Sequence, residues 1–170
     1  PRASTREEPD ERSATANAGL MVFLASASHG LEELLGRGAP SITFRAGRTK
    51  GLEVEVQRKE PDDLTAALDA VAEEMTRIGM QWPFEVYKKD DEASPFSQVD
   101  GKTQAKLVFR NCLIRSSLFR YGHEQKLSLC MMNHGVFCGL LEKIHGGRAN
   151  LEIIHAGENA CLKLLTVQKG

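Results

Sequence analysis

The sequence lacks an excess of charge of either sign. Its 22 Lys and Arg residues nearly balance its 23 Asp and Glu residues, and the formal net charge is −1. A surface that binds nucleic acid needs a large positive excess on one face. The charge balance therefore argues against a nucleic-acid-binding module.

The sequence also lacks a long hydrophobic run. The longest, Leu20 to Ala25, is far shorter than the ~20 apolar residues that a bilayer span needs, and no basic segment precedes it as in a secretion signal. We therefore expect no membrane span and a cytoplasmic protein. In that compartment the four cysteines are expected to be reduced thiols, metal ligands or redox groups in preference to structural disulfides.

Large apolar residues are missing from residues 1–18. That segment contains no Val, Ile, Leu, Met, Phe, Trp or Tyr, and seven of its eighteen residues are charged. It cannot bury enough apolar surface to offset the entropy of ordering it. We therefore predict a disordered arm over residues 1–18 and a single domain over residues 19–170, a length that can hold its own core.

The remaining sequence shows a mixture of helical and strand patterns. Apolar residues at helical spacing predict a helix from Leu64 to Ile78, closed by Gly79, and a second helix from about Ser128 to His145. Residues 20–38 suit one or two short helices, and residues 39–56 allow either a helix or a strand. Four strands are predicted, at FEVYKK, QAKLVFRN, residues 149–154 and residues 160–167, and DDEASPFSQVDG between the first two reads as a loop. This order predicts an α+β domain with helices packed on one face of an antiparallel sheet of about four strands.

Cysteine and histidine side chains gather near the C-terminal end of the sequence. Cys130, His134 and Cys138 stand at i, i+4 and i+8 of the second helix and share one stripe. Cys161 begins the final strand, and His155 ends the strand before it. Tetrahedral zinc takes four thiolate or imidazole ligands, so Cys130, Cys161 and two of the other three residues could form a zinc site. The alternative is that Cys138 is a small core residue, as buried cysteines commonly are.

Motifs of large enzyme classes are missing. The sequence has no Walker A motif, no G-x-G-x-x-G after a strand and no G-x-S-x-G elbow, so we predict no catalytic residue. A pocket between helices and sheet would suit a flat apolar or aromatic ligand, although core packing explains the same side chains. Its predicted lining residues are Phe44, Met75, Trp82, Phe109, Met132 and Phe137.

Two glycine patterns give the sequence a resemblance to a known family. The helix pattern C-x-x-x-x-G-x-x-x-G, here Cys130, Gly135 and Gly139 followed by two leucines, and the turn pattern G-[DE]-x-x-C, here Gly157 to Cys161, resemble the 4-vinyl reductase domain, also called the hydrocarbon-binding domain. Residues 30–51 are similar to the opening of that family, a short helix followed by a segment ending in A-G-x-x-x-G. The resemblance favours a helix for the ambiguous stretch.

The resemblance also implies a function and a fold. Family members carry a further cysteine four residues before the turn glycine, where this chain has Ile153, and His155 would substitute for it. The fold is similar to that of transport-particle (TRAPP) subunits. The implied function is a stand-alone, homodimeric small-molecule sensor or carrier with a structural zinc. The alternatives are an accessory protein or reductase of tetrapyrrole or bacteriochlorophyll biosynthesis, and a non-catalytic assembly subunit with a protein partner.

Overall fold

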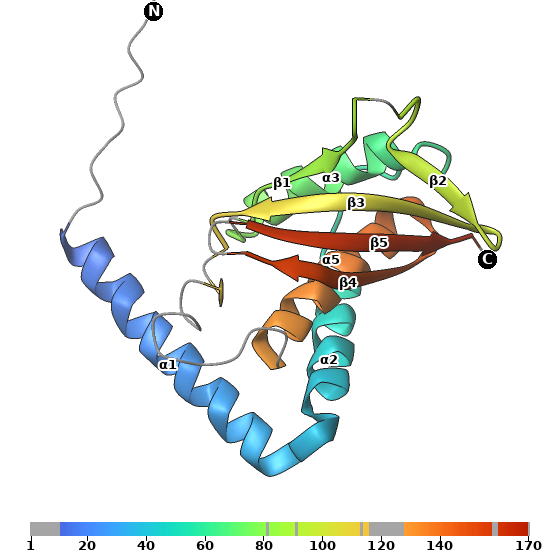
Figure 1. Cartoon of the computed structure of the whole chain (residues 1–170). Coiled ribbons are helices and arrows are strands. Elements are labelled where there is room, and N and C mark those ends of the chain that lie inside the picture. The colour runs from blue at the N-terminus through green and yellow to red at the C-terminus, as the bar shows by residue number, and fades with distance from the viewer. Residues whose placement is uncertain are drawn as a thin grey trace, which may run out of the picture.

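The computed structural model of the chain describes residues 11–80, 82–90, 92–112, 114–115, 128–157 and 160–169, with side chains from residue 17 onward. The first ten residues of the predicted arm and two residues of the family-like turn, Glu158 and Asn159, lie outside the described residues. The architecture is an α+β domain in which helices cover one face of an antiparallel sheet (Figure 1). The predicted fold class is therefore confirmed.

The sheet has five strands but is only four strands wide. The strands are β1 (Phe84–Tyr87), β2 (Phe96–Val99), β3 (Lys102–Arg110), β4 (Arg148–Ala156) and β5 (Ala160–Gln168). Their order is β1-β3-β5-β4, and β2 also pairs with β3. β1 pairs with residues 106–109 of β3 and β2 with residues 102–105, so both lie along the same edge of β3. β2 falls in the stretch that was predicted to be a loop, and this prediction was wrong.

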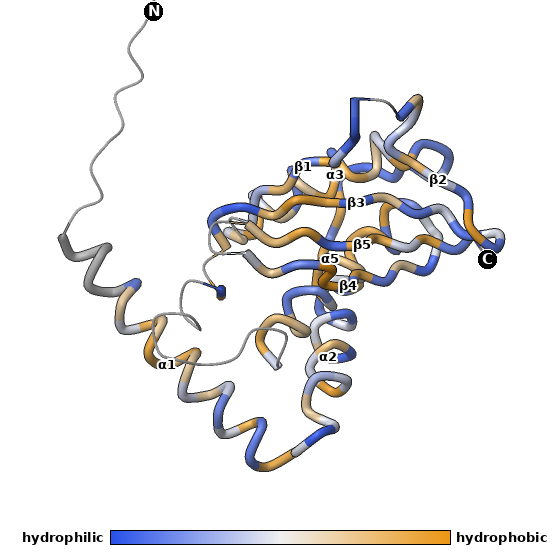
Figure 2. Tube along the Cα trace, in the orientation of Figure 1, coloured by the Kyte–Doolittle hydropathy of each residue, from blue (hydrophilic) through white to orange (hydrophobic). Residues whose placement is uncertain are grey.

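The inner face of the sheet is covered by α3 (Leu64–Arg77) and α5 (Ser128–His145). Asp63 caps the N-terminus of α3, and its carboxylate accepts hydrogen bonds from the backbone N–H groups of Thr65 and Ala66 at 2.8 and 3.2 Å. The helix ends before Gly79, which takes a φ of +80°. Both helices occupy the ranges that their apolar spacing predicted. Figure 2 shows that apolar residues run along β3, β5 and α5, which form the core between the two layers.

The helix α2 (Ala39–Glu53) crosses α5 at very short range. A Cβ built on Gly47 would lie 2.0 Å from the Met132 carbonyl oxygen, and one built on Gly135 would lie 2.1 Å from the Phe44 carbonyl oxygen. Gly51 and Gly139 make the matching approach one turn further along. The G-x-x-x-G pattern of α5 thus meets a second G-x-x-x-G pattern in α2, and only glycine lets two backbones approach this closely.

An ion pair also stabilises the crossing of α2 and α5. Arg48 of α2 donates from Nε to Glu142 of α5 at 3.0 and 2.8 Å, and Glu142 also accepts from the backbone N–H of Ala149 on β4 at 3.0 Å. The side chain of Glu142 is 7% exposed. The hydrogen bond that Arg48 donates to Glu142 raises the pKa of Arg48. One buried carboxylate therefore links α2, α5 and β4.

The N-terminal helix α1 (Glu11–Leu35) is longer than predicted and runs away from the sheet (Figure 1). The predicted boundary at residue 18 falls inside this helix. Ser28 lies within it and donates to Glu32 at 3.0 Å, and Glu32 accepts from the N-terminal N–H of α5, that of Ser128, at 3.1 Å. A short 3-10 turn, Gly36–Gly38, leads into α2. None of the helices in the described part of the chain has the length and apolar composition of a membrane span.

Candidate ligand site around Lys163

A buried lysine stands at the centre of the inner sheet face. Side chains of β5 alternate, and Cys161, Lys163, Leu165 and Val167 all point toward the helices and are buried. Lys163 is only 3% exposed. Because strand alternation fixes its direction, its ammonium group is held under α5 and cannot reach solvent at the opposite face.

Three side chains surround this ammonium group. Lys163 Nζ donates to Nε2 of His134, on α5, at 2.8 Å. The same nitrogen lies 4.1 Å from the ring centroid of Trp82, which precedes β1, and 4.5 Å from that of Phe109 on β3. Both distances are typical of cation–π contacts. We call Trp82, Phe109, His134 and Lys163 the Lys163 cluster.

The electrostatics of the Lys163 cluster follow from its burial. Burial lowers the pKa of Lys163 to about 8, against a smaller opposing effect of Cys112, Cys130, Cys161 and Cys138. Burial and then the charge of Lys163 lower the pKa of His134 to about 3. At neutral pH Lys163 is therefore charged and His134 is neutral. An ammonium group can only donate, so Nε2 of His134 is the acceptor and Nδ1 carries the proton.

Several buried donors near the Lys163 cluster have no hydrogen-bond partner. Within the described ranges these are Trp82 Nε1, Arg115 Nε, His134 Nδ1 and, at the start of α5, Ser128 Oγ. Buried polar atoms are nearly always paired in folded proteins. A group of buried donors without partners in one region is a place where a bound molecule can supply the acceptors.

The Lys163 cluster lies among further aromatic rings. Trp82 and Phe109 have ring centroids 4.2 Å apart, and Phe84 and Phe137 lie 5.2 and 5.7 Å from Phe109. Trp82 also lines a surface groove of about 450 Å³ together with Met75, Met80 and Phe84. This volume lies within the range of small-molecule sites. The groove offers a flat ring an apolar surface, and Trp82 is the residue that it shares with the Lys163 cluster.

Comparison with known proteins finds a solved structure with a similar fold. No family model and no curated protein matches the sequence. Among solved structures, the chain is similar to the phenol-responsive sensory domain of the transcription activator PoxR with phenol, at a TM-score of 0.57 and 12% sequence identity, over 87% of this chain and 74% of that chain. The two chains share a fold.

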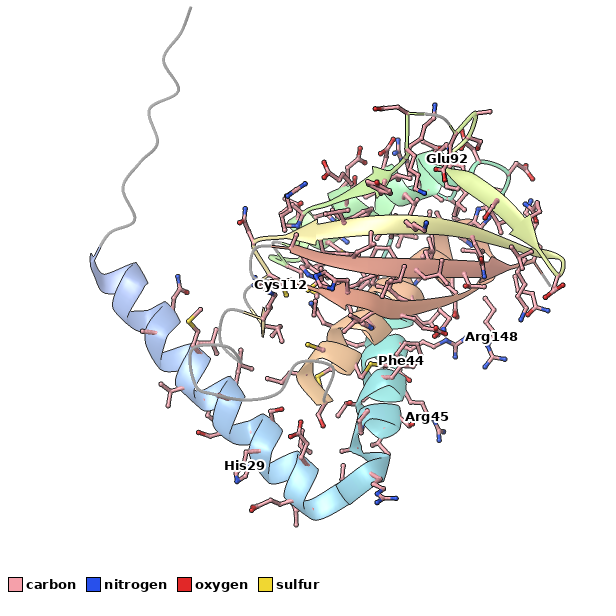
Figure 3. All side chains as sticks on the ribbon, in the orientation of Figure 1. His29, Phe44, Arg45, Glu92, Cys112 and Arg148 are labelled. Carbon is pink, nitrogen blue, oxygen red and sulfur yellow. The ribbon has the colours of Figure 1, made fainter. Side chains whose placement is uncertain are left out.

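Four of the six predicted ligand-lining residues are brought together. Met75 and Trp82 line the groove, and Phe109 and Phe137 pack against Trp82. Phe44 lies on α2, in a different hollow of about 470 Å³ that it shares with Arg48 and Arg148 (Figure 3). The backbone of Met132 lies against Gly47 at the helix crossing, and its side chain is half-buried. Their roles in ligand binding stay predictions.

The structure brings four of the five predicted metal ligands, Cys130, His134, Cys138 and Cys161, into the region of Lys163 and separates His155 from them. A bulge after Ile153 pairs His155 with Leu162, so His155 is exposed on the outer face of the sheet, opposite Cys161 and Lys163. Burial raises the pKa of the thiols of Cys138 and Cys161, which opposes thiolate formation. Across the described ranges, no group of three or more His, Cys, Asp or Glu side chains could hold a metal ion.

The lone pair of His134 is engaged by a lysine rather than by a metal. His134 Nε2 accepts from Lys163, and Cys130 and Cys161 both lie within electrostatic reach of the same ammonium group. A second cation at this position would repel the first in a region of low dielectric constant. The described donor set therefore does not fit zinc.

Sequence reasoning missed Lys163 and Arg115. The signal for Lys163 was present, because strand alternation places it with Cys161, Leu165 and Val167. Leucines at positions 162 and 164 hid that signal, since they make the opposite face of the strand look equally apolar. No pattern in the sequence distinguishes Arg115 from an exposed arginine.

Proposed function

We propose that this chain is a small-molecule-binding sensory or carrier domain, and that its ligand binds at the Lys163 cluster. The observation that carries the proposal is the presence of unpaired buried donors, Trp82 Nε1 above all, among closely packed aromatic rings. Ligand sites typically combine an apolar lining with a few placed polar groups. The phenol-responsive domain with which the chain shares its fold supports the same function.

The proposal assigns distinct roles to the residues of the site. Trp82 and Phe109 provide flat apolar surfaces for the body of the ligand. Lys163 and the indole N–H of Trp82 donate to its polar group, and His134 holds the ammonium group of Lys163 in place. No bond of the ligand needs to break, so the site is proposed to bind and not to catalyse.

Assembly as a homodimer is part of this proposal. The long helix α1 exposes large apolar side chains, with Phe23 and Leu34 exposed at 67% and 84%. Exposed apolar patches of this kind are common at protein interfaces. Resemblance to the 4-vinyl reductase domain adds support, because the related transport-particle subunits work as assembled pairs.

Native mass spectrometry of the untreated protein tests the proposal. We expect a dimer that retains a small molecule, and we expect thermal unfolding to shift upward when aromatic compounds are added. A ligand at 100 times its dissociation constant stabilises the folded state by about 2.7 kcal/mol. A chain that carries no small molecule and shows no shift with any aromatic compound would contradict the proposal. A stable heteromeric partner in a pull-down would favour the assembly-subunit alternative instead.

A further inference from the structure

Two cations are buried near one another without a carboxylate partner. Lys163 is 3% exposed and Arg115 is 8% exposed. In the described part of the chain neither residue forms an ion pair with Asp or Glu. Both act electrostatically on Cys161, which places them in the same region. A buried charge is costly unless it is paired, so this region needs an anion.

Neighbouring thiols are poor candidates for that anion. The four cysteines all lie within electrostatic reach of Lys163 or of Cys161. Burial raises the pKa of the thiols of Cys138 and Cys161, which opposes their conversion to thiolates. Glu142 acts electrostatically on Cys138 as Lys163 does, but this carboxylate is already paired with Arg48. Among the described residues no carboxylate pairs with Lys163 or Arg115, so a bound anion can supply the counter-charge.

The hydrogen-bonding groups that lack a partner also indicate a ligand that carries acceptors. Trp82 Nε1 and Arg115 Nε are buried donors that lack a partner among the described residues. Lys163 uses one of its three N–H bonds on His134, and this bond takes the only acceptor of that ring. The groups of Trp82, Arg115 and Lys163 that remain without a partner are therefore all hydrogen-bond donors. A ligand that fits them must be rich in acceptors, and a carboxylate accepts about four hydrogen bonds.

We propose that the ligand of the Lys163 cluster is an aromatic carboxylate whose negative charge is paired with Lys163. This inference rests on the proposed function and adds the chemical class of the ligand. The carboxylate accepts from Lys163 Nζ and Trp82 Nε1, and the ring of the ligand lies against Trp82 and Phe109. The groove of about 450 Å³, which shares Trp82 with the cluster, has room for one or two aromatic rings.

Isothermal titration calorimetry with matched probes tests this inference. The probes are benzoate and 2-naphthoate, each paired with its neutral amide, benzamide and 2-naphthamide. For the wild-type chain at pH 7 we expect each carboxylate to bind at least tenfold more tightly than its amide. In Lys163→Met we expect the carboxylates to lose at least tenfold in affinity while the amides change less than twofold. Lys106→Met is the matched control, because Lys106 pairs with Leu164 on the outer face of β3, and it should bind like the wild type.

The outcomes separate the two proposals. Amides that bind as tightly as carboxylates would overturn the inference and leave the proposed function standing. Equal losses of both series in Lys163→Met would also overturn it, because the role of Lys163 would then be structural. No binding by either series would contradict both proposals. If Lys163→Met does not fold, the comparison of carboxylate with amide in the wild-type chain decides the inference by itself.

Discussion

The crossing of α2 and α5 leaves no space for a methyl group at Gly135, and this makes Gly135→Ala a sharp test of the fold. An alanine Cβ at that position would lie 2.1 Å from the Phe44 carbonyl oxygen and 2.7 Å from the Arg48 nitrogen. Ordinary contact begins at about 3.4 Å. The obstructing atoms belong to the backbone of a helix, so the clash cannot be relieved by rotating a side chain.

The expected cost follows from two opposing effects. In an open helical position, Gly→Ala favours the helix by about 1 kcal/mol. Overpacking of a dense interior typically costs about 1–3 kcal/mol and occasionally more. Because two helical backbones must separate, and the contacts at Gly47, Gly51 and Gly139 loosen with them, we expect Gly135→Ala to lower the free energy of unfolding by about 3 kcal/mol.

Urea denaturation followed by far-ultraviolet circular dichroism measures this change. Gly30→Ala is the matched control, since Gly30 lies inside α1 and a Cβ there meets nothing within 4 Å. It should be neutral or stabilising by up to about 1 kcal/mol. If Gly135→Ala proves as stable as Gly30→Ala, the close approach of α2 to α5 is wrong.

Four further predictions concern charges and metal. Below pH 8 the folded state carries the full cost of the buried Lys163 charge, and between pH 8 and 10.5 it releases that proton while the unfolded chain keeps it. Lys163→Met should therefore raise the free energy of unfolding at pH 7 by up to about 3 kcal/mol. Denaturation measured at a series of pH values should show this gain fading by pH 10.5. A loss of stability at pH 7 would contradict the prediction. The imidazole of His134 stays neutral in the folded state, whereas it takes up a proton in the unfolded chain below pH 6.5. As the pH falls from 6.5 toward 3, the free energy of unfolding of the wild type should therefore drop by up to about 4 kcal/mol more than that of His134→Gln. Parallel acid-unfolding curves for the two proteins would refute the neutral imidazole. Arg48→Met leaves the buried carboxylate unpaired and should cost about 2 kcal/mol, whereas Lys50→Met, which removes an exposed pair, should cost less than about 0.5 kcal/mol; equal midpoints in urea would count against the difference. We expect metal analysis of the purified chain to find no stoichiometric zinc. If the wild type does contain zinc and Cys161→Ser does not, the zinc site predicted from the sequence is correct.

Elements whose own pattern carries the signal were predictable from the sequence. α3 and α5 each place apolar residues at helical spacing between clear start and stop residues, and both appear in the expected ranges. The two G-x-x-x-G motifs contributed to the family resemblance, and the structure alone shows that they pack against each other. α2 was ambiguous locally because it contains residues typical of strands, and its glycines acquire their meaning only from contact with α5.

Features that depend on distant partners were not predictable. β2 is only four residues long, and it forms a strand because it pairs with the edge of β3. His155 was expected beside Cys161, and the bulge after Ile153 turned it to the other face. The alternation of β5 does place Lys163 with Cys161 and Leu165, but the leucines at positions 162 and 164 make the other face of the strand look equally apolar, so the sequence does not show which face is buried. The ligand-binding part of the account therefore comes from the tertiary structure, whereas the fold class came from the sequence.

Fluorescence of Trp82, the single tryptophan of the chain, tests the central claim most directly. Its indole ring touches both the groove and Lys163, so a ligand at the Lys163 cluster must change its emission. Titration with 2-naphthoate, excited where the probe itself is transparent or corrected for its absorbance, should give a saturable change with one ligand per chain. A signal that stays unchanged while calorimetry reports binding would place the ligand elsewhere and contradict the account.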